Sequence, residues 1–286
     1  MELIKVLYAF ISVAALGGVL GIGLAIASRV LAVKKDARIE RVEEALPGLN
    51  CGACGYAGCS SYAEAIVEES APLTQCTPGG AGVAKALAEI MGQEIDVSSE
   101  KKVAQVHCRG THETSTYLFE YRGIQDCNAL HLYFDGDKEC KYGCLGLGSC
   151  IQVCPVEAID YDQQGCVWID RDKCISCGKC IDVCPTGVIK WIPYEADYIV
   201  ACNSNDKGGR VKKYCSVGCI GCKICEKKSP EGGFVVENFL STIDYSAKGD
   251  RSEAVKACPT NCIIAIKETE PEKKGEEKVT ADSSDG

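Results

Sequence analysis

The sequence predicts an α+β protein that begins with one transmembrane helix and continues through a small helical domain into tandem modules of short helices and strands. Three features support this prediction: a long uncharged run near the N-terminus, four cysteines within 51–76, and a cysteine–proline motif that occurs three times within 136–266. A chain of 286 residues is long enough for one or two ordinary domains. We expect six segments: an anchor at 1–33, a four-cysteine domain at 34–95, a connecting region at 96–135, a first module at 136–195, a second module at 196–266 and a disordered tail at 267–286.

The predicted membrane anchor is the uncharged run from Val6 to Ser28. A helix of this length covers roughly 34 Å, which exceeds the roughly 30 Å of a hydrocarbon core. Four basic residues follow the run and one precedes it: Arg29, Lys34, Lys35 and Arg38 after it, and Lys5 before it. The positive-inside rule then predicts a single-pass protein of the cell (inner) membrane with the bulk of the chain in the cytoplasm. The alternative is a cleaved signal peptide, which would have a shorter apolar region and would export reduced thiolates into an oxidising compartment.

Cysteine is the unusual part of the composition, with 22 cysteines against three histidines. Such a density indicates either a disulfide scaffold or a set of metal sites. A disulfide scaffold would be short and secreted, whereas these cysteines form tight groups followed by proline, which favours metal ligation. The few histidines argue against mixed Cys/His zinc sites and against haem. The formal charge of −9 suits a redox protein and argues against a nucleic-acid binder.

The four-cysteine domain combines helical periodicity with a glycine-rich group of thiols. Apolar residues at helical spacing predict helices near 39–46, 62–67 and 83–90. The thiols of this domain are Cys51, Cys54, Cys59 and Cys76. Four thiolates in a small, helix-flanked unit predict a [4Fe–4S] cluster, and a structural zinc site is the alternative.

The first module carries the ligand run of bacterial ferredoxins, C-x2-C-x2-C-x3-C-P, from Cys174 to Pro185. In such a run the first three cysteines bind one [4Fe–4S] cluster and the fourth binds the neighbouring cluster. A stretched version of the run begins at Cys140 and ends at Cys154. Crossed pairing predicts two clusters, one on Cys140, Cys144, Cys150 and Cys184, and the other on Cys154, Cys174, Cys177 and Cys180.

The second module has the same layout but lacks half of the cysteines. Ser229 stands where the run should have its fourth cysteine. We aligned residues 169–170 of the first module with residues 243–244 of the second, which places Cys258 at the position of Cys184. In this alignment the positions of Cys174, Cys177 and Cys180 are occupied by Lys248, Arg251 and Ala254. The missing thiolates are those of one complete cluster. We therefore expect a ferredoxin-like module with a single cluster, and four clusters in the whole chain, the last held by Cys219, Cys222, Cys225 and Cys258.

Six cysteines lie outside these four sets. Cys262 occupies a small core position of the repeat, so we do not expect it to be a ligand. Cys166 and Cys202 lie in strand-like runs, which is typical of buried thiols. For the other three, both a structural role and a ligand or redox role stay open: Cys108, Cys127 and Cys215.

These motifs, in this order, resemble those of the B subunit of the bacterial Rnf complex. The resemblance rests on LPGLNCGACGYAGC, CKYGCLGLGSC and CISCGKCIDVCP, and VKKYCSVGCIGCKICEKK resembles the extended form of that protein found in anaerobes. It implies membership of a membrane-bound ferredoxin:NAD⁺ oxidoreductase that transports Na⁺ or H⁺. Electrons in that family pass between ferredoxin and a flavin- and NAD-binding subunit through membrane subunits. The missing cysteines of the second module depart from the pattern of longer relatives, so their cluster count does not carry over.

We expect the chain to be an electron-transfer subunit of such a complex. It has no glycine-rich nucleotide loop and no candidate nucleophile or general base, so its chemistry is the one-electron exchange of its clusters. NAD⁺, flavin and the ion path would then belong to partner subunits. Two alternatives stay open: a membrane-tethered polyferredoxin that serves another reductase, and a zinc protein or cluster-based sensor without electron flux.

A basic region at 207–228 predicts a docking site for a soluble, acidic ferredoxin. Together with the preceding Asp206 it contains seven basic residues and two acidic ones, Asp206 and Glu226, in a chain whose net charge is −9. Complementary charge of this kind guides encounter between electron-transfer partners. The alternatives are a solvated face and a contact with another subunit. The seven basic residues are Lys207, Arg210, Lys212, Lys213, Lys223, Lys227 and Lys228.

Overall fold

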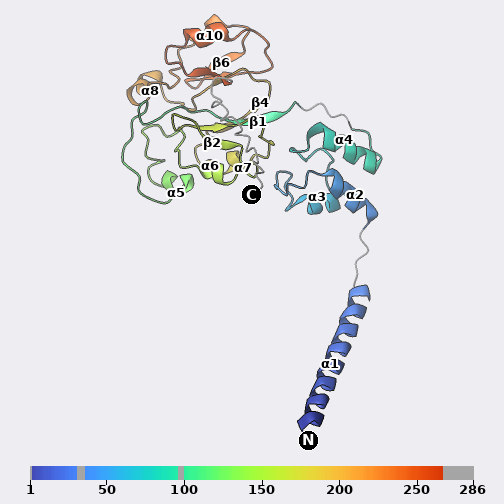
Figure 1. Ribbon diagram of the computed structural model, residues 1–286. Coiled ribbons are helices and arrows are strands. Elements are labelled where there is room, and N and C mark those ends of the chain that lie inside the picture. The colour runs from blue at the N-terminus through green and yellow to red at the C-terminus, as the bar shows by residue number, and fades with distance from the viewer. Residues whose placement is uncertain (1, 31–35, 96–99, 267–286) are drawn as a thin grey trace, which may run out of the picture.

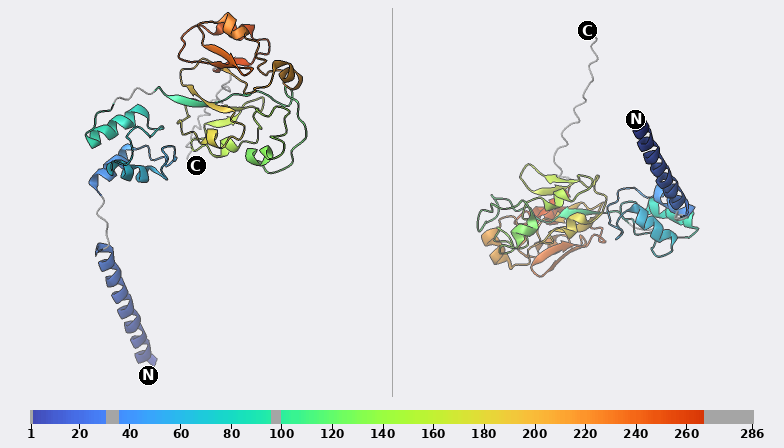
Figure 2. Two further views of the ribbon diagram at one scale, coloured as in Figure 1. Left: turned by 180° about the vertical axis from the view of Figure 1, so that it is seen from behind. Right: turned by 90° about the horizontal axis from the view of Figure 1, so that it is seen from below.

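The computed structural model describes residues 2–30, 36–95 and 100–266. Figure 1 shows three parts: a single N-terminal helix, a lobe of three helices, and a larger body of short helices and strands. Figure 2 shows the same three parts from behind and from below. The predicted disordered tail at 267–286, and the basic residues Lys34 and Lys35 behind the predicted anchor, lie outside the described residues.

The N-terminal helix, α1, extends from Glu2 to Val30 and projects away from the other elements (Figure 1). In the part of the chain that the structure describes, no helix is long and apolar enough to cross a membrane. A span needs roughly twenty consecutive apolar residues. The prediction of a transmembrane helix within 1–33 is therefore corrected, and the fold described is a mixed α and β one.

The lobe consists of α2 (Ala37–Ala45), α3 (Cys59–Val67) and α4 (Gly80–Met91). Asp36 caps α2, because its carboxylate accepts a hydrogen bond from the backbone N–H of Arg38 at 2.8 Å. The largest buried side chains are Val42 from α2, Tyr62 and Ile66 from α3, and Leu87 from α4. These residues recur at helical spacing, so the three predicted helices share one core.

The body contains four two-stranded antiparallel sheets. Its first half consists of β1 (Lys102–Val106), α5 (Cys127–His131), α6 (Ser149–Gln152), β2 (Ile159–Tyr161), β3 (Val167–Ile169), α7 (Lys179–Asp182) and β4 (Ile189–Pro193). Its second half consists of β5 (Tyr198–Val200), α8 (Gly208–Tyr214), α9 (Ile224–Lys228), β6 (Phe234–Glu237), β7 (Leu240–Ile243), α10 (Ser252–Ala257) and β8 (Ile263–Ala265).

The two halves share one plan. Each places a hairpin, β2–β3 or β6–β7, between two short helices. The strand after the last cysteine–proline of each half then pairs with the first strand of that half: β4 with β1, and β8 with β5. Val106 lies opposite Ile189, and Val200 lies opposite Ile263. The segments that follow β1 and β5 therefore begin at equivalent positions of the two halves.

Each half has its own small core, and each core contains cysteine. In the first half Val106, Ile159 and Ile189 pack with the buried Cys150 and Cys180. The core of the second half combines aliphatic and aromatic side chains with buried thiols: Val200, Phe234, Leu240, Cys219, Cys225 and Ile263. The thiols are thus part of the packing and are not surface additions to it.

Candidate metal centres

In the helical lobe, the four predicted cysteines line one cavity of about 320 Å³: Cys51, Cys54, Cys59 and Cys76. Cys59 is the first residue of α3, and its backbone N–H donates to the side-chain oxygen of Asn50 at 2.8 Å. Gly52 and Gly55 have φ of 74° and 85°, a backbone conformation in which a Cβ would be strained, so the loop between the thiols needs glycine there. Burial raises the pKa of Cys76, and the thiols of the other three cysteines raise it further. The sequence prediction and the geometry therefore agree on this set.

In the first half of the body, one cavity of about 370 Å³ is lined by Cys127, Cys144, Cys150 and Cys184. Three of these cysteines belong to the predicted set, but Cys127 stands in the place of Cys140. The backbone N–H of Cys127 donates to the hydroxyl of Ser149 at 2.7 Å, and this hydroxyl donates to the carboxylate of Asp126 at 3.2 Å. These bonds hold the start of α5 against the start of α6. Burial raises the pKa of Cys150 to about 12, with Cys127 and Cys184 as further causes.

The second predicted set of this half comprises Cys154, Cys174, Cys177 and Cys180. Burial raises the pKa of Cys180 to about 12, and the other three thiols of the set are among its charged neighbours, together with Cys150. The backbone N–H of Ala158 donates to the sulfur of Cys154 at 3.3 Å. Gly178, which begins α7, has φ of 80° and gives the loop its sharp turn between the second and third thiols. The four predicted thiols are therefore neighbours.

In the second half, Cys219, Cys222, Cys225 and Cys258 line a cavity of about 330 Å³. Cys262 lines it too, and its sulfur lies 3.6 Å from that of Cys258. Hydrogen bonding with the Cys262 thiol is the first cause that lowers the pKa of Cys258 to about 5 and that of Cys219 to about 6. Cys262 is buried as predicted, but sequence reasoning missed that its thiol faces the other four.

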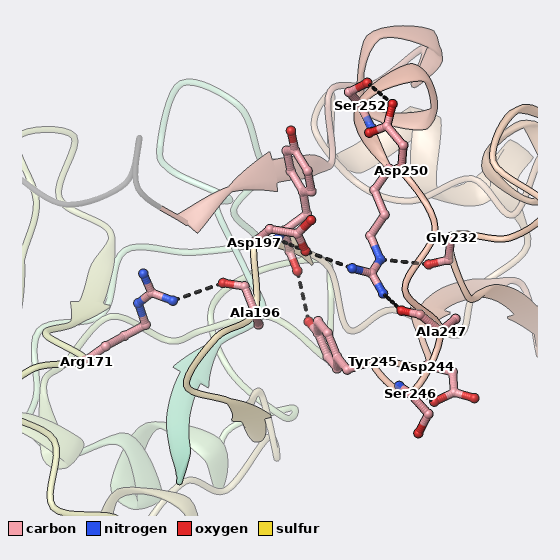
Figure 3. Close-up of polar contacts among 12 residues, drawn as sticks. Arg171, Ala196, Asp197, Gly232, Asp244, Tyr245, Ser246, Ala247, Asp250 and Ser252 are labelled. Carbon is pink, nitrogen blue, oxygen red and sulfur yellow. Dashed lines mark hydrogen bonds and ion pairs between the residues drawn. The ribbon is translucent and has the colours of Figure 1, made fainter. Parts of the chain in front are cut away.

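Figure 3 shows the polar contacts at Asp197, Gly232 and Ala247. Arg251, one of the four positions at which this half lacks a predicted ligand cysteine, is buried. Its guanidinium donates to the carbonyl oxygens of Gly232 at 2.7 Å and Ala247 at 2.6 Å, and pairs with the carboxylate of Asp197 at 3.0 Å. Two other positions without cysteine, Ser229 and Ala254, are buried, and Lys248 is exposed. Of the four positions without cysteine, three are thus buried, and Arg251 is held by hydrogen bonds and an ion pair.

A further cavity, of about 380 Å³, is lined by four cysteines that the sequence did not group: Cys108, Cys140, Cys202 and Cys215. Two of them occupy equivalent positions in the internal repeat. Cys108 lies two residues after the end of β1, and Cys202 lies two residues after the end of β5. Cys215 ends α8, and no local spacing relates it to the others.

The donor sets fit iron–sulfur clusters. In the described residues, no three or more His, Cys, Asp or Glu side chains converge closely enough to form a site for a single metal ion. The cysteines instead line separate cavities in groups of four or five, and four thiolates are what a [4Fe–4S] cluster requires. All 22 cysteines are free thiols. The fold and these sites define an iron–sulfur protein of the ferredoxin type that carries [4Fe–4S] clusters.

Comparisons with known proteins agree with this class. A family model described as a putative Fe-S cluster matches residues 46–78, and one described as a 4Fe-4S binding domain matches residues 167–190. The B subunit of the ion-translocating oxidoreductase complex of Methanosarcina acetivorans is 42% identical over 87% of this chain and 94% of its own length. The B subunit of the Na⁺-translocating ferredoxin:NAD⁺ oxidoreductase complex of Acetobacterium woodii is 43% identical over 86% of this chain and 74% of its own length. The B subunit of the proton-translocating ferredoxin:NAD⁺ oxidoreductase complex of Clostridium ljungdahlii is 42% identical over 88% of this chain and 89% of its own length.

The chain belongs to the family of B subunits of these ion-translocating oxidoreductase complexes, which are also called Rnf complexes. The resemblance inferred from the cysteine motifs is thereby confirmed.

Proposed function

We propose that the chain relays single electrons between ferredoxin and the partner subunits of an ion-translocating ferredoxin:NAD⁺ oxidoreductase at the cell membrane. The observation that carries this proposal is the series of thiol-lined cavities that runs from the helical lobe through both halves of the body. A [4Fe–4S] cluster supplies reversible one-electron exchange at each such position. Flavin, NAD⁺ and the transported Na⁺ or H⁺ would bind to other subunits.

The four ligand sets of the proposal are those suggested by sequence and cavity together: Cys51, Cys54, Cys59 and Cys76; Cys154, Cys174, Cys177 and Cys180; Cys127, Cys144, Cys150 and Cys184; and Cys219, Cys222, Cys225 and Cys258. Three are the predicted sets, and in one Cys127 replaces Cys140. The protein's own contributions are to hold the thiolates, to exclude water with apolar walls, and to donate hydrogen bonds to sulfur, which tune the potential. The hydrogen bond from Ala158 to Cys154 is one such bond.

Neighbouring thiols suggest the order of the relay. Cys51 of the helical lobe is among the charged neighbours that, after burial, raise the pKa of Cys177. Within the first half, Cys150 belongs to one set and is a charged neighbour of Cys180 in the other. Electrons could thus pass between the lobe and both clusters of the first half without leaving the chain, which is the arrangement that a relay requires.

The basic region at 207–228 supports docking of ferredoxin at the second half. All seven of its basic side chains are exposed, and they lie on or beside α8 and α9. Cys222 is exposed among them, so this edge of the site faces the solvent. The two acidic residues of the region are partly neutralised within it, because Asp206 pairs with Arg210 at 3.7 Å and Glu226 with Lys223 at 4.0 Å. An acidic partner would therefore meet a positive surface over a ligand of the cluster.

The test is charge reversal of Lys227 and Lys228, which are exposed in the last turn of α9. Lys227→Glu with Lys228→Glu should slow reduction of the full-length protein by ferredoxin about tenfold or more at low ionic strength, and added salt should reduce the difference. The measurement is stopped-flow absorbance near 400 nm under anaerobic conditions. A matched control reverses two exposed lysines elsewhere, Lys85 and Lys102. Equal rates for both variants at low salt would reject docking at this region.

The wider proposal is tested by purification of the native complex. We expect the chain to co-purify with a flavoprotein subunit, and the chain alone to accept electrons from reduced ferredoxin but not from NADH. Reduction of the isolated chain by NADH, or co-purification with an unrelated reductase, would contradict the proposal.

A further inference from the structure

The cavity lined by Cys108, Cys140, Cys202 and Cys215 has the properties of a cluster site. Its volume of about 380 Å³ is close to the roughly 320–370 Å³ of the three cavities lined by the other cysteine sets. Four thiols line it, which is the number that a [4Fe–4S] cluster requires. The rest of the lining is mixed: Ala201, Val211 and Gly218 are small or apolar, whereas Arg109 and Asn203 are polar.

Two short backbone pairings bring the four thiols together from distant segments. Residues around Ser115 pair with Cys215: the N–H of Thr116 donates to the oxygen of Tyr214 at 2.8 Å, and the N–H of Ser216 to that of Thr114 at 2.9 Å. On the other side, the N–H of Glu139 donates to the oxygen of Thr116 at 3.0 Å. The segment around 114–118 thus fixes Cys140 and Cys215 relative to each other, while β1 and β5 deliver Cys108 and Cys202.

Glycine and hydrogen-bond donors surround the sulfurs. A Cβ on Gly143 would lie 3.7 Å from the sulfurs of both Cys108 and Cys140, so glycine leaves this space open. The backbone N–H of Gly110 donates to the sulfur of Cys108 at 3.4 Å, and that of Ser204 donates to the sulfur of Cys202 at 3.5 Å. Such N–H to sulfur bonds stabilise the negative charge of cluster ligands.

Lys138 supplies a positive charge at the same place. It is 5% exposed and lines the cavity, and its ammonium donates to the carbonyl oxygens of Gly110 at 2.8 Å and Cys144 at 2.7 Å. No carboxylate forms an ion pair with it among the residues that the structure describes. A buried cation is costly unless a negative charge lies close by. Four thiolates around a [4Fe–4S] core carry a net negative charge and would balance it.

We propose that Cys108, Cys140, Cys202 and Cys215 bind a fifth [4Fe–4S] cluster, which lies between the clusters of the first and second halves. Cys140 is four residues from Cys144 of one neighbouring site, and Cys215 is four residues from Cys219 of the other. The five sites use all cysteines except Cys166 and Cys262. In the relay, which rests on the proposed function, one electron leaves a reduced neighbour and reduces this cluster, which then passes it on.

Iron, sulfide and zinc analysis of the full-length protein, purified without oxygen, tests the site. About twenty irons per chain are expected for the wild type and about sixteen for Cys215→Ala, with no zinc. Cys166→Ala is the matched control, since it also removes a buried thiol but should keep about twenty irons. The EPR spectrum of the reduced Cys215→Ala protein should lose one cluster signal and keep the others.

About sixteen irons in the wild type, or one zinc per chain with sixteen irons, would overturn the fifth cluster and leave the relay proposal intact. Near-absence of iron would overturn both. Cys108→Ala removes a ligand from a different segment and should show the same loss of four irons. If Cys215→Ala does not accumulate, the wild-type count and Cys108→Ala decide the question.

Discussion

At the level of single residues, Lys138 places a buried positive charge beside a proposed cluster, where it would affect the reduction potential of that cluster. Its ammonium lies between the carbonyl oxygen of Cys144, a ligand of one proposed cluster, and the cavity that Cys108 and Cys140 line. A positive charge in a region shielded from water stabilises the more negative, reduced state of a nearby cluster. The residue therefore sets a potential without ligating iron.

Replacement of Lys138 by Met keeps the length and the apolar stem of the side chain but removes the charge. We expect Lys138→Met to retain its iron and to shift one cluster signal to a lower reduction potential, because reduction would add negative charge without the compensating cation. A redox titration followed by EPR measures this shift. Lys141→Met is the matched control, since Lys141 is exposed and pairs with Asp135 at the surface. An unchanged titration for Lys138→Met would contradict the role given to this charge.

Cys262 shows a second way in which one residue affects a site. Its sulfur lies 3.6 Å from that of Cys258. Hydrogen bonding with this thiol is the first cause that holds the pKa values of Cys258 and Cys219 well below the ordinary value of a thiol. Low thiol pKa values favour the thiolate that iron requires. The sequence assigned Cys262 to the core from its place in the repeat, and only its neighbours reveal the additional contact.

Among the helices and strands, the second half keeps the hairpin between two short helices although four predicted ligand positions lack cysteine. α9 and α10 pack against each other, and Arg251 at the start of α10 bonds to the loop between β7 and α10 and to Gly232. The fold of the half is therefore preserved although four ligand positions lack cysteine.

Arg251→Ala should destabilise the protein by about 2–3 kcal/mol, because it leaves buried carbonyl groups of Gly232 and Ala247 without a partner. The measurement is urea denaturation of the anaerobic protein followed by circular dichroism. Arg122→Ala is the control: Arg122 is 80% exposed, and its pair with Glu120 is expected to contribute at most a few tenths of a kcal/mol. Equal stability of both variants would show that Arg251 does not hold this half together.

Across the molecule as a whole, the sites form a series from the helical lobe to the basic region. The fifth site is the link between the two halves of the body. Because electron transfer slows steeply with distance, loss of this link should divide the series into two parts.

Cys215→Ala should therefore leave the initial reduction by ferredoxin unchanged and slow the later electron flow to the other clusters at least tenfold. Freeze-quench EPR after mixing with reduced ferredoxin would show one cluster reduced at the normal rate and the others delayed. The control is Cys166→Ala, for which all phases should keep wild-type rates. Undelayed reduction of all clusters in Cys215→Ala would show that electrons enter elsewhere or do not pass through this site.

The features of this protein that depend on local spacing could be predicted from its sequence. The thiols from Cys174 to Cys180, and those from Cys51 to Cys76, each lie within a short stretch of chain, so residue spacing predicts which of them share a site. The three helices of the lobe could be predicted because apolar residues recur at helical spacing within short segments. The family could be predicted because its cysteine motifs are contiguous stretches of sequence. Helices such as α6 and α7 are too short to be stable alone, and they form because the surrounding core holds them.

Features that depend on contacts between distant segments emerged only in three dimensions. Ser115 and Cys215 are a hundred residues apart in the sequence, and their pairing helps to assemble a cavity that no motif encodes. Crossed pairing predicted Cys140 beside Cys144, Cys150 and Cys184, whereas the contact between α5 and α6 places Cys127 beside these three cysteines. The described part of α1 also corrected the membrane prediction, which rested on the composition of a continuous run. Local spacing constrains thiols on one loop, but strand pairing and packing determine which loops meet.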